Sequence, residues 1–269
     1  MNAIVVQGKF SNNTELILEH YLTTNDCMVI LSSYDDTPSV VLEKLSKKFS
    51  NFKCVLQPEP KILGKQNRNA QRFSTYRGIE LACSFGAEYV LKCRTDHVFK
   101  CDDIINKLFN YMNKYPIANT NQKSRIVIPN SGTTLEEKWG THHISDFWSY
   151  GHVDDLIRYF DINNPYWDRN KEINYMTPFP PAGKPFPSPE PEFCNLWLKY
   201  ENINLSLKDL LTTRFAVHDV HTLEYSKHAK DKVEDINECV TLTPHICPLC
   251  NGKHMDGKTV HQKIWESWL

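Results

Sequence analysis

One stretch of the sequence decides the fold class: Tyr89-Val90-Leu91-Lys92-Cys93-Arg94-Thr95-Asp96-His97. Its first residues are largely apolar, and a run of this length that ends in polar residues is typical of a buried strand. A buried strand end is a costly place for charge, yet an arginine, a carboxylate and an imidazole stand here. In sheets of parallel strands, ligands bind beyond the carboxyl ends. The stretch therefore predicts both a central strand and the sheet edge that carries a site.

Further apolar runs lie on either side of this strand along the chain, and helical patterns separate them. The runs upstream lie at 4–6, 28–31 and 52–56, and later strands are expected at 125–129 and 215–221. Helices are expected after residue 11, from Thr37-Pro38, from about Asn67 to Phe85, and from Glu190. This alternation predicts an α/β fold, with a mostly parallel sheet and helices on both faces. We expect one such domain over residues 1–230 and a tail over residues 231–269.

The composition is that of an ordinary globular chain. Of the 269 residues, 41% are hydrophobic and 23% are charged, which excludes a disordered or collagen-like protein. The 31 Lys and Arg nearly balance the 32 Asp and Glu, so the chain lacks the positive excess that favours nucleic acid as a partner. No apolar run reaches the length of a membrane-spanning helix, and no signal peptide is recognised. Nine scattered cysteines indicate a reducing compartment, and we expect a cytoplasmic protein with mostly free thiols.

Known nucleotide-binding fingerprints are missing, so the site must be read from individual residues. The chain contains no G-x-G-x-x-G after its first strand and no G-x-x-x-x-G-K-[ST], which argues against a dehydrogenase and a P-loop NTPase. It also contains no G-x-S-x-G, the nucleophile elbow of α/β-hydrolases. Arg68 and Arg72 lie four residues apart near the start of the helix expected from Asn67. Such a pair at the positive end of a helix predicts an anion site, although a solvated basic first turn is the alternative.

Asp96 is the candidate for binding a metal ion or a diphosphate. A carboxylate at a strand end suits Mg²⁺ or Mn²⁺, which prefer oxygen ligands and can offset the charge of a nucleotide diphosphate. The alternative is a loop aspartate that caps the next helix, but Asp102 and Asp103 are better placed for that role. Gln7 and Gly8, which end the first strand, are expected beside Asp96 at the same edge.

Two longer segments resemble a known family. They are Asn69-Ala70-Gln71-Arg72-Phe73-Ser74-Thr75-Tyr76-Arg77-Gly78-Ile79 and residues 88–96. They are similar to the WavE-type lipopolysaccharide-synthesis family, with its polar N/R-x-x-S-T helix and its strand ending Lys-x-Arg-Ser/Thr-Asp. Further matches are Ile144 to Gly151, Asp154-Asp155-Leu156 and Ser188-Pro189-Glu190, so the resemblance covers residues 3–225 in order.

This resemblance implies a glycosyltransferase with a GT-A-like, Rossmann-type sheet. The donor would be a nucleotide sugar of UDP or GDP type, and the acceptor a carbohydrate in polysaccharide or glycan synthesis. Gln7, Gly8, Arg68, Arg72, Arg94, Thr95 and Asp96 would then lie on the donor side. Arg94-Thr95-Asp96 stands where that fold carries Asp-x-Asp, but position 94 is an arginine. Either Asp96 holds Mn²⁺ or Mg²⁺ alone, or Arg94 binds the diphosphate directly.

Two carboxylates compete for the role of general base. Asp146 lies in His142-His143-Ile144-Ser145-Asp146-Phe147-Trp148, where Trp148 is either a sugar platform or a core residue. Glu190 follows a Pro-rich stretch at 163–191, which we expect to form an acceptor-side loop. A turn at Ser145-Asp146 and an ordinary helix start at Glu190 are the alternatives.

Late histidines and the tail offer further metal ligands. In GT-A enzymes a late histidine often completes the metal site, so His218 or His221 is expected to reach the ion held by Asp96. Cys247, Cys250 and His254 have the spacing of zinc ligands, and Cys239 or His245 could be the fourth ligand. The alternative is a loop in which the two thiols are incidental. Three roles are compatible with Trp265 and Trp268: packing on the core, a contact in a homodimer, or a peripheral contact with a membrane.

Two other functions are compatible with the same layout. A sugar-nucleotide nucleotidyltransferase would carry a Gly-rich loop after the first strand, which Gln7-Gly8-Lys9 matches poorly. A zinc-ribbon binding module on an α/β scaffold would rest on the Cys/His tail, whose pattern is incomplete.

Overall fold

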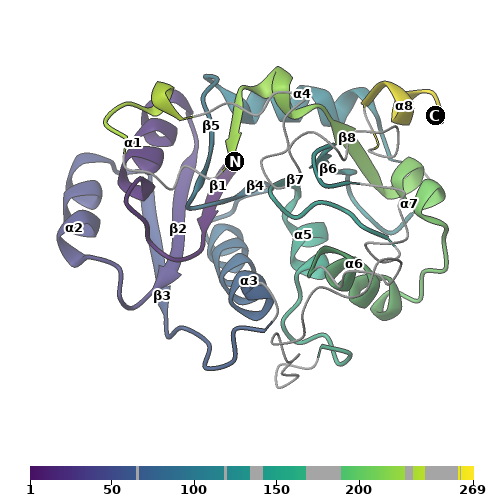
Figure 1. The fold of residues 1–269 in the computed structure, drawn as a ribbon, viewed down its shortest axis with the longest axis horizontal. Helices are drawn as coiled ribbons and strands as arrows, with labels where there is room; N and C mark the ends of the chain where they lie inside the picture. Colours follow the sequence, from purple (N-terminus) through teal and green to yellow (C-terminus); the bar gives the residue numbers. More distant parts are fainter. Residues whose placement is uncertain are drawn as a thin grey trace, which may run out of the picture.

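The computed structural model describes residues 1–64, 67–117, 120–133, 142–167, 189–227, 233–239, 260 and 262–269. Its strands are β1 (Asn2–Gln7), β2 (Met28–Tyr34), β3 (Phe52–Gln57), β4 (Tyr89–Arg94), β5 (His97–Phe99), β6 (Ile126–Pro129), β7 (Ser149–His152), β8 (Phe215–His218) and β9 (Tyr225–Lys227). Seven of these form one sheet in the order β3-β2-β1-β4-β7-β6-β8, and β5 pairs with β9 in a two-stranded sheet (Figure 1).

The large sheet is parallel except at one strand. Strands β1 to β4 pair in parallel with their neighbours, and so do β6 and β8. Strand β7 runs antiparallel to both β4 and β6. The expected α/β fold with a mostly parallel sheet is thus confirmed. Because β7 is reversed, the residues that precede it lie at the edge where the other six strands have their carboxyl ends.

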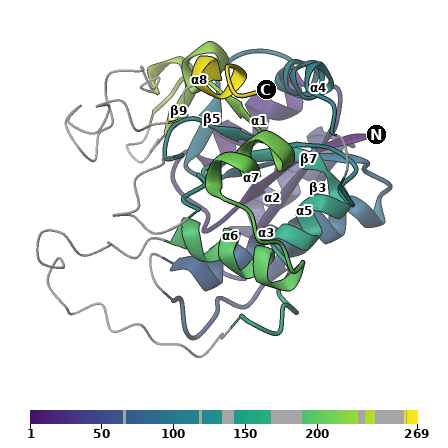
Figure 2. The same ribbon diagram turned by 90° about the vertical axis from the view of Figure 1, so that its right-hand side faces the viewer.

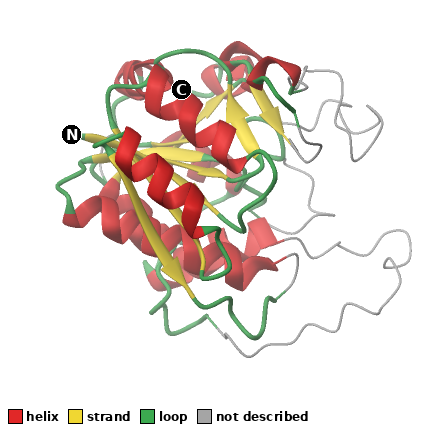
Figure 3. Cartoon of the chain, turned by 90° about the vertical axis from the view of Figure 1, so that its left-hand side faces the viewer, coloured by secondary structure: helices red, strands yellow, loops and turns green. Residues whose placement is uncertain are grey.

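Helices cover both faces of this sheet. They are α1 (Thr14–Thr24), α2 (Ser39–Lys48), α3 (Arg68–Ser84), α4 (Ile104–Lys114), α5 (Val153–Tyr159), α6 (Pro189–Tyr200), α7 (Leu207–Arg214) and α8 (Gln262–Glu266). In the sheet, β2 lies beside β1 and β3 beside β2, whereas β4 lies on the other side of β1. Right-handed crossovers therefore place α3 on the face opposite α1 and α2. Figures 1 and 2 show α3, α5 and α6 on one side and α4 and α8 on the other, and in Figure 3 the yellow strands run between red helices.

The helix expected from Asn67 to Phe85 is confirmed as α3, and it lies very close to the sheet. Asn67 and Phe85 are its two capping residues. A Cβ on Gly78 would overlap Val5 and stand 2.9 Å from Ser32 Cβ, so only glycine allows this approach. The residues of β1 and β2 beneath are almost all buried, as expected of strands covered on both faces.

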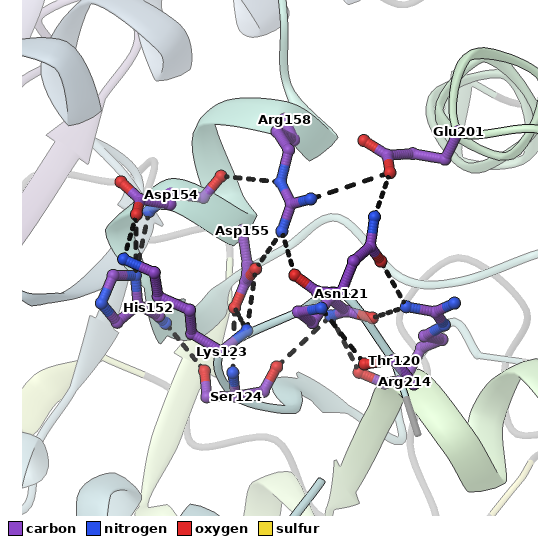
Figure 4. A network of polar contacts seen from close by, with 11 residues as sticks. Thr120, Asn121, Lys123, Ser124, His152, Asp154, Asp155, Arg158, Glu201 and Arg214 are labelled. Atoms are coloured by element: carbon purple, nitrogen blue, oxygen red, sulfur yellow. Dashed lines mark hydrogen bonds and ion pairs between the residues drawn. The ribbon is translucent and has the colours of Figure 1, made fainter. Parts of the chain in front are cut away.

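A polar network fastens the chain at the opposite edge, where the parallel strands begin. Asp155, whose side chain is fully buried, accepts the backbone N–H groups of Lys123 and Ser124 and pairs with Arg158 at 2.6 Å. Figure 4 shows Arg158 between Asp155 and Glu201. A shallow hollow of about 550 Å³ opens beside this network. The contacts tie the segment before β6 to α5 and to the end of α6.

The described residues near the end of the chain pack against earlier segments. Val260 donates its N–H to the carbonyl of Thr133, and the fully buried Trp265 donates to the carbonyl of Leu211 at 2.8 Å. Of the alternatives for Trp265, core packing is therefore the one found. Within the described ranges all cysteines are free thiols, and none of the helices is long and apolar enough to cross a membrane.

Candidate functional site

The carboxyl ends of β1 and β4 lie side by side and are joined by direct contacts. The N–H of Thr95 donates to the carbonyl of Gln7 at 3.0 Å, and its hydroxyl donates to the carbonyl of Lys9 at 2.8 Å. Gly8 has a φ of 123°, and a Cβ there would lie 3.1 Å from Thr95 Oγ1. Three residues expected on the donor side, Gln7, Gly8 and Thr95, are thus neighbours. Ser74 of α3 joins them, because its hydroxyl donates to Gln7 Oε1 at 2.7 Å.

Arg94 and Asp96 form a two-armed ion pair just beyond β4. Arg94 Nε donates to Asp96 Oδ1 at 2.9 Å and Nη2 donates to Oδ2 at 3.1 Å. Burial alone would lower the pKa of Arg94, but the Asp96 carboxylate outweighs it and raises that pKa. The arginine side chain is 33% exposed, against 14% for the aspartate. The guanidinium therefore stays charged and is held in one orientation, on a side chain that is about one-third exposed.

His97 lies next to the carboxylate of this ion pair. Its ring is fully buried, with Nε2 3.7 Å from Asp96 Oδ1 and Nδ1 2.5 Å from the hydroxyl of Tyr225 on β9. Phe147 packs edge-on against the same ring, with 5.7 Å between centroids. The pairing of β5 with β9 thus braces the turn at Asp96. The N-cap residue of α4 is Asp103, so Asp96 does not cap that helix.

The expected divalent-metal ligands do not meet in the part of the chain described here. His218 ends β8, three strands away from β4, which corresponds to about 14 Å. Its Nδ1 lies 3.1 Å from the carbonyl of Asp219, and its ring packs on Tyr111. His221 lies in a 3-10 helix, Val220–Leu223, and is exposed. The described ranges hold no group of three or more His, Cys, Asp or Glu that could bind an ion.

Asp96 also fits a metal poorly, because both of its oxygens are already engaged by Arg94. The grouping of Asp96 with His218 and His221 is therefore corrected, while dependence on Mn²⁺ or Mg²⁺ stays a prediction. Cys247, Cys250 and His254 lie outside the described residues, and the zinc hypothesis stays a prediction as well.

Asp146 lies at the same edge because it precedes the reversed strand β7. It is 5% exposed, and Gln71 of α3 donates to its Oδ2. Its other oxygen, Oδ1, accepts no hydrogen bond from the described residues. Trp148, two residues on, is fully buried and packs edge-on against Phe99, so the sugar-platform alternative was wrong.

Lys92 is a site residue to which the sequence analysis gave no role. It lies in the middle of β4 with a fully buried side chain, and its Nζ donates to the backbone carbonyl of Asp146. Burial lowers the pKa of Lys92 to about 8, although the Asp146 carboxylate opposes that shift. A lysine inside an otherwise apolar strand is the sequence signal that was available.

Arg68 and Arg72 are buried and bonded within the protein, so the solvated first turn was wrong. Arg68 forms an ion pair with Glu192 of α6 and is 1% exposed. Arg72 is fully buried and donates to the carbonyl of Asp161 through Nε at 3.1 Å and Nη2 at 2.7 Å. Burial lowers the pKa of Arg72 to about 10. Both join α3 to its neighbours, and a direct contact with a donor stays a prediction.

Glu190 begins α6 on the same side of the sheet. It is partly buried, and its charge acts on Lys92, as does that of Asp146. Residues 168–188 of the expected acceptor-side loop lie outside the described ranges. The two rival bases therefore face one buried cation, and the geometry favours Asp146 through its direct contacts.

No protein-family model and no curated protein matches this chain. Its likeness to solved structures is remote. TarS from S. aureus in complex with UDP is 16% identical, covers 48% of this chain and 35% of that one, and has a TM-score of 0.32. HddC from Yersinia pseudotuberculosis complexed with GMP-PN is 11% identical and has a TM-score of 0.37. The match covers 65% of this chain and 84% of that one.

A third solved structure, the 4-diphosphocytidyl-2C-methyl-D-erythritolsynthase from Anaerococcus prevotii, is 10% identical with a TM-score of 0.45. It covers 88% of this chain and 92% of that one. The chain spans between 30% and 51% of the TarS structures. At such identities and TM-scores, function must be argued from this chain's own residues.

Proposed function

We propose that the chain is a glycosyltransferase that moves a sugar from a nucleotide-sugar donor of UDP or GDP type to a carbohydrate acceptor. One observation carries the proposal. Arg94, which is partly exposed and held in one orientation, and the buried carboxylate of Asp146 come from distant segments and lie at the same carboxyl edge. The two groups also interact electrostatically, because the charge of the Asp146 carboxylate raises the pKa of Arg94. The resemblance of residues 69–79 and 88–96 to the WavE-type family agrees with this function.

The transfer can be written with these residues. The acceptor hydroxyl attacks the anomeric carbon, a new C–O bond forms, and the bond to the diphosphate breaks with its electron pair leaving on the diphosphate. Asp146 Oδ1 takes the proton, since Oδ2 is already bonded to Gln71. Arg94 stabilises the leaving diphosphate, because a guanidinium binds such oxygens in pairs. Asp96 keeps Arg94 in position.

The test is a screen of nucleotide sugars for hydrolysis and transfer, with thermal stabilisation measured alongside. A ligand that binds the native state raises the melting temperature by mass action. Mn²⁺ and Mg²⁺ are added in separate arms to test the predicted cation. We expect one nucleotide sugar to stabilise the chain and to be turned over, and Asp146→Asn to remove turnover but not stabilisation.

The matched control is Asp102→Asn, because Asp102 is exposed and lies away from this edge. A further arm offers nucleoside triphosphates with sugar 1-phosphates. Release of diphosphate in that arm, with no transfer from nucleotide sugars, would replace the proposal by a nucleotidyltransferase.

A further inference from the structure

Lys92 is a buried cation for which the fold alone gives no reason. Its neighbours along β4, Leu91 and Cys93, are fully buried as well, and its ammonium lies 5.7 Å from the ring centre of Phe160. An ammonium in such surroundings is costly unless it is paired, and an apolar residue of similar size would usually be as stable. The only hydrogen bond that Lys92 makes to the described residues goes to the carbonyl of Asp146.

The charges that face Lys92 come from three parts of the fold. Asp146, before β7, and Glu190, on α6, act favourably on the ammonium. Arg94 opposes it from the same strand, and since side chains two residues apart share a face of a strand, the two cations point to the same side. The buried ammonium is thus subject to the charges of both candidate bases and of the guanidinium proposed for the diphosphate.

We propose that Lys92 is a positioning residue of the transfer reaction, which fixes the main chain at Asp146 and supplies the positive charge that both carboxylates face. This rests on the proposed function. Gln71 holds the Asp146 side chain from α3 while Lys92 holds its backbone from β4, so the carboxylate is fixed from two elements. A base fixed in this way needs little reorganisation when the acceptor binds.

The first test needs no substrate. The chain is labelled with ¹³C at Cε of lysine, and the Lys92 resonance is assigned by its loss in Lys92→Met. We expect it to titrate near pH 8, as its lowered pKa requires. Asp146→Asn should lower that midpoint, Glu190→Gln should lower it less, and Asp102→Asn should leave it unchanged. An unchanged midpoint in Asp146→Asn would overturn the inference, because coupling between two charges is reciprocal.

The second test is kinetic. Lys92→Met keeps the unbranched side chain up to its last heavy atom but removes its charge, and we expect kcat to fall by about 10²-fold while UDP or GDP binding hardly changes. The wild-type rate should also decline as pH rises through about 8, where Lys92 loses its proton, and this decline should be absent in Lys92→Met. A purely structural lysine would lower the melting temperature and leave the shape of the pH profile unaltered.

The two tests separate the possible failures. Coupling without any turnover of nucleotide sugars would overturn the proposed function while leaving the charge pairing in place. Turnover with no coupling, or with the same pH profile in Lys92→Met, would overturn the role of Lys92 alone.

Discussion

The two edges of the sheet use charge in different ways. At the amino edge, Asp155 has the N–H groups of Lys123 and Ser124 and the guanidinium of Arg158 as partners, and Asn121 links Glu201 to Arg214. At the carboxyl edge, Lys92 has one hydrogen bond, and Nη1 of the buried Arg72 has none to the described residues. The network around Asp155 fastens the chain. At the carboxyl edge, Arg94 and Asp96 are also paired, but the Lys92 ammonium keeps hydrogen-bond donors that no described residue uses, and its charge faces two carboxylates.

The sharpest way to test this difference is to remove the proposed base. Asp146→Asn keeps the shape but loses the proton acceptor, so turnover should fall by about 10²–10⁴. The chain should still fold, because an amide can still accept from Gln71, but its melting temperature should fall somewhat, because the buried Lys92 ammonium loses a carboxylate that faces it. Steady-state kinetics and thermal unfolding measure the two effects.

Glu190→Gln is the matched control for this experiment. A large loss there with a mild loss in Asp146→Asn would reverse the assignment of the base. If neither change slows transfer, a retaining reaction without a carboxylate base becomes the better description.

The amino edge should respond in the opposite sense. Asp155→Ala leaves two backbone N–H groups and Arg158 without their shared partner, and we expect a loss of about 3–5 kcal/mol in unfolding free energy. Denaturant unfolding measures it. The kcat of the folded fraction should not change, and a selective loss of kcat would erase the distinction between the edges.

Lys92 gives a prediction for stability against pH. Its pKa is lowered from 10.5 to about 8 in the folded chain, so between these values the unfolded chain binds more protons. Folding stability from this group therefore rises with pH over that window. The unfolding free energy of wild type minus that of Lys92→Met should increase by up to about 3 kcal/mol from pH 8 to 10.5. Denaturant titrations at several pH values follow this difference, and a constant difference would mean that Lys92 is not desolvated.

The smallest effect is expected on the rim of the amino edge. Lys123 and Asp154 form an ion pair whose side chains are 58% and 47% exposed. Lys123→Met should leave both the melting temperature and turnover within error, because water screens such pairs. A clear drop in melting temperature would show that the network in Figure 4 extends to its exposed members.

The elements around the first strands were predictable because their signals are local. Apolar runs bounded by polar residues gave β1 to β4. Strand β7 was missed, since Ser149-Tyr150-Gly151-His152 is short and partly polar and is specified by its neighbours in the sheet.

That omission explains why the candidate site could be predicted only in part. The place of Arg94 and Asp96 follows from their own strand. The place of Asp146 depends on the reversal of β7, and the burial of Arg72 depends on Asp161 and Phe193, far along the chain. Periodicity carries no information about such contacts, so neither the ion pair of Arg68 with Glu192 nor the bond from Lys92 to Asp146 was foreseen.

The contact between His97 and Tyr225 bears on how the chain acquires its site during synthesis. The two residues are 128 positions apart, and at about 5–20 residues per second the ribosome needs about 6–26 seconds to pass from one to the other. The first four strands can pair in that interval, whereas the turn at Asp96 must wait for β9. Non-local pairing of this kind forms late because a long loop has to close. A nascent chain that already holds four of the seven strands of its large sheet is therefore expected to lack the braced turn at Asp96 until β9 has left the ribosome.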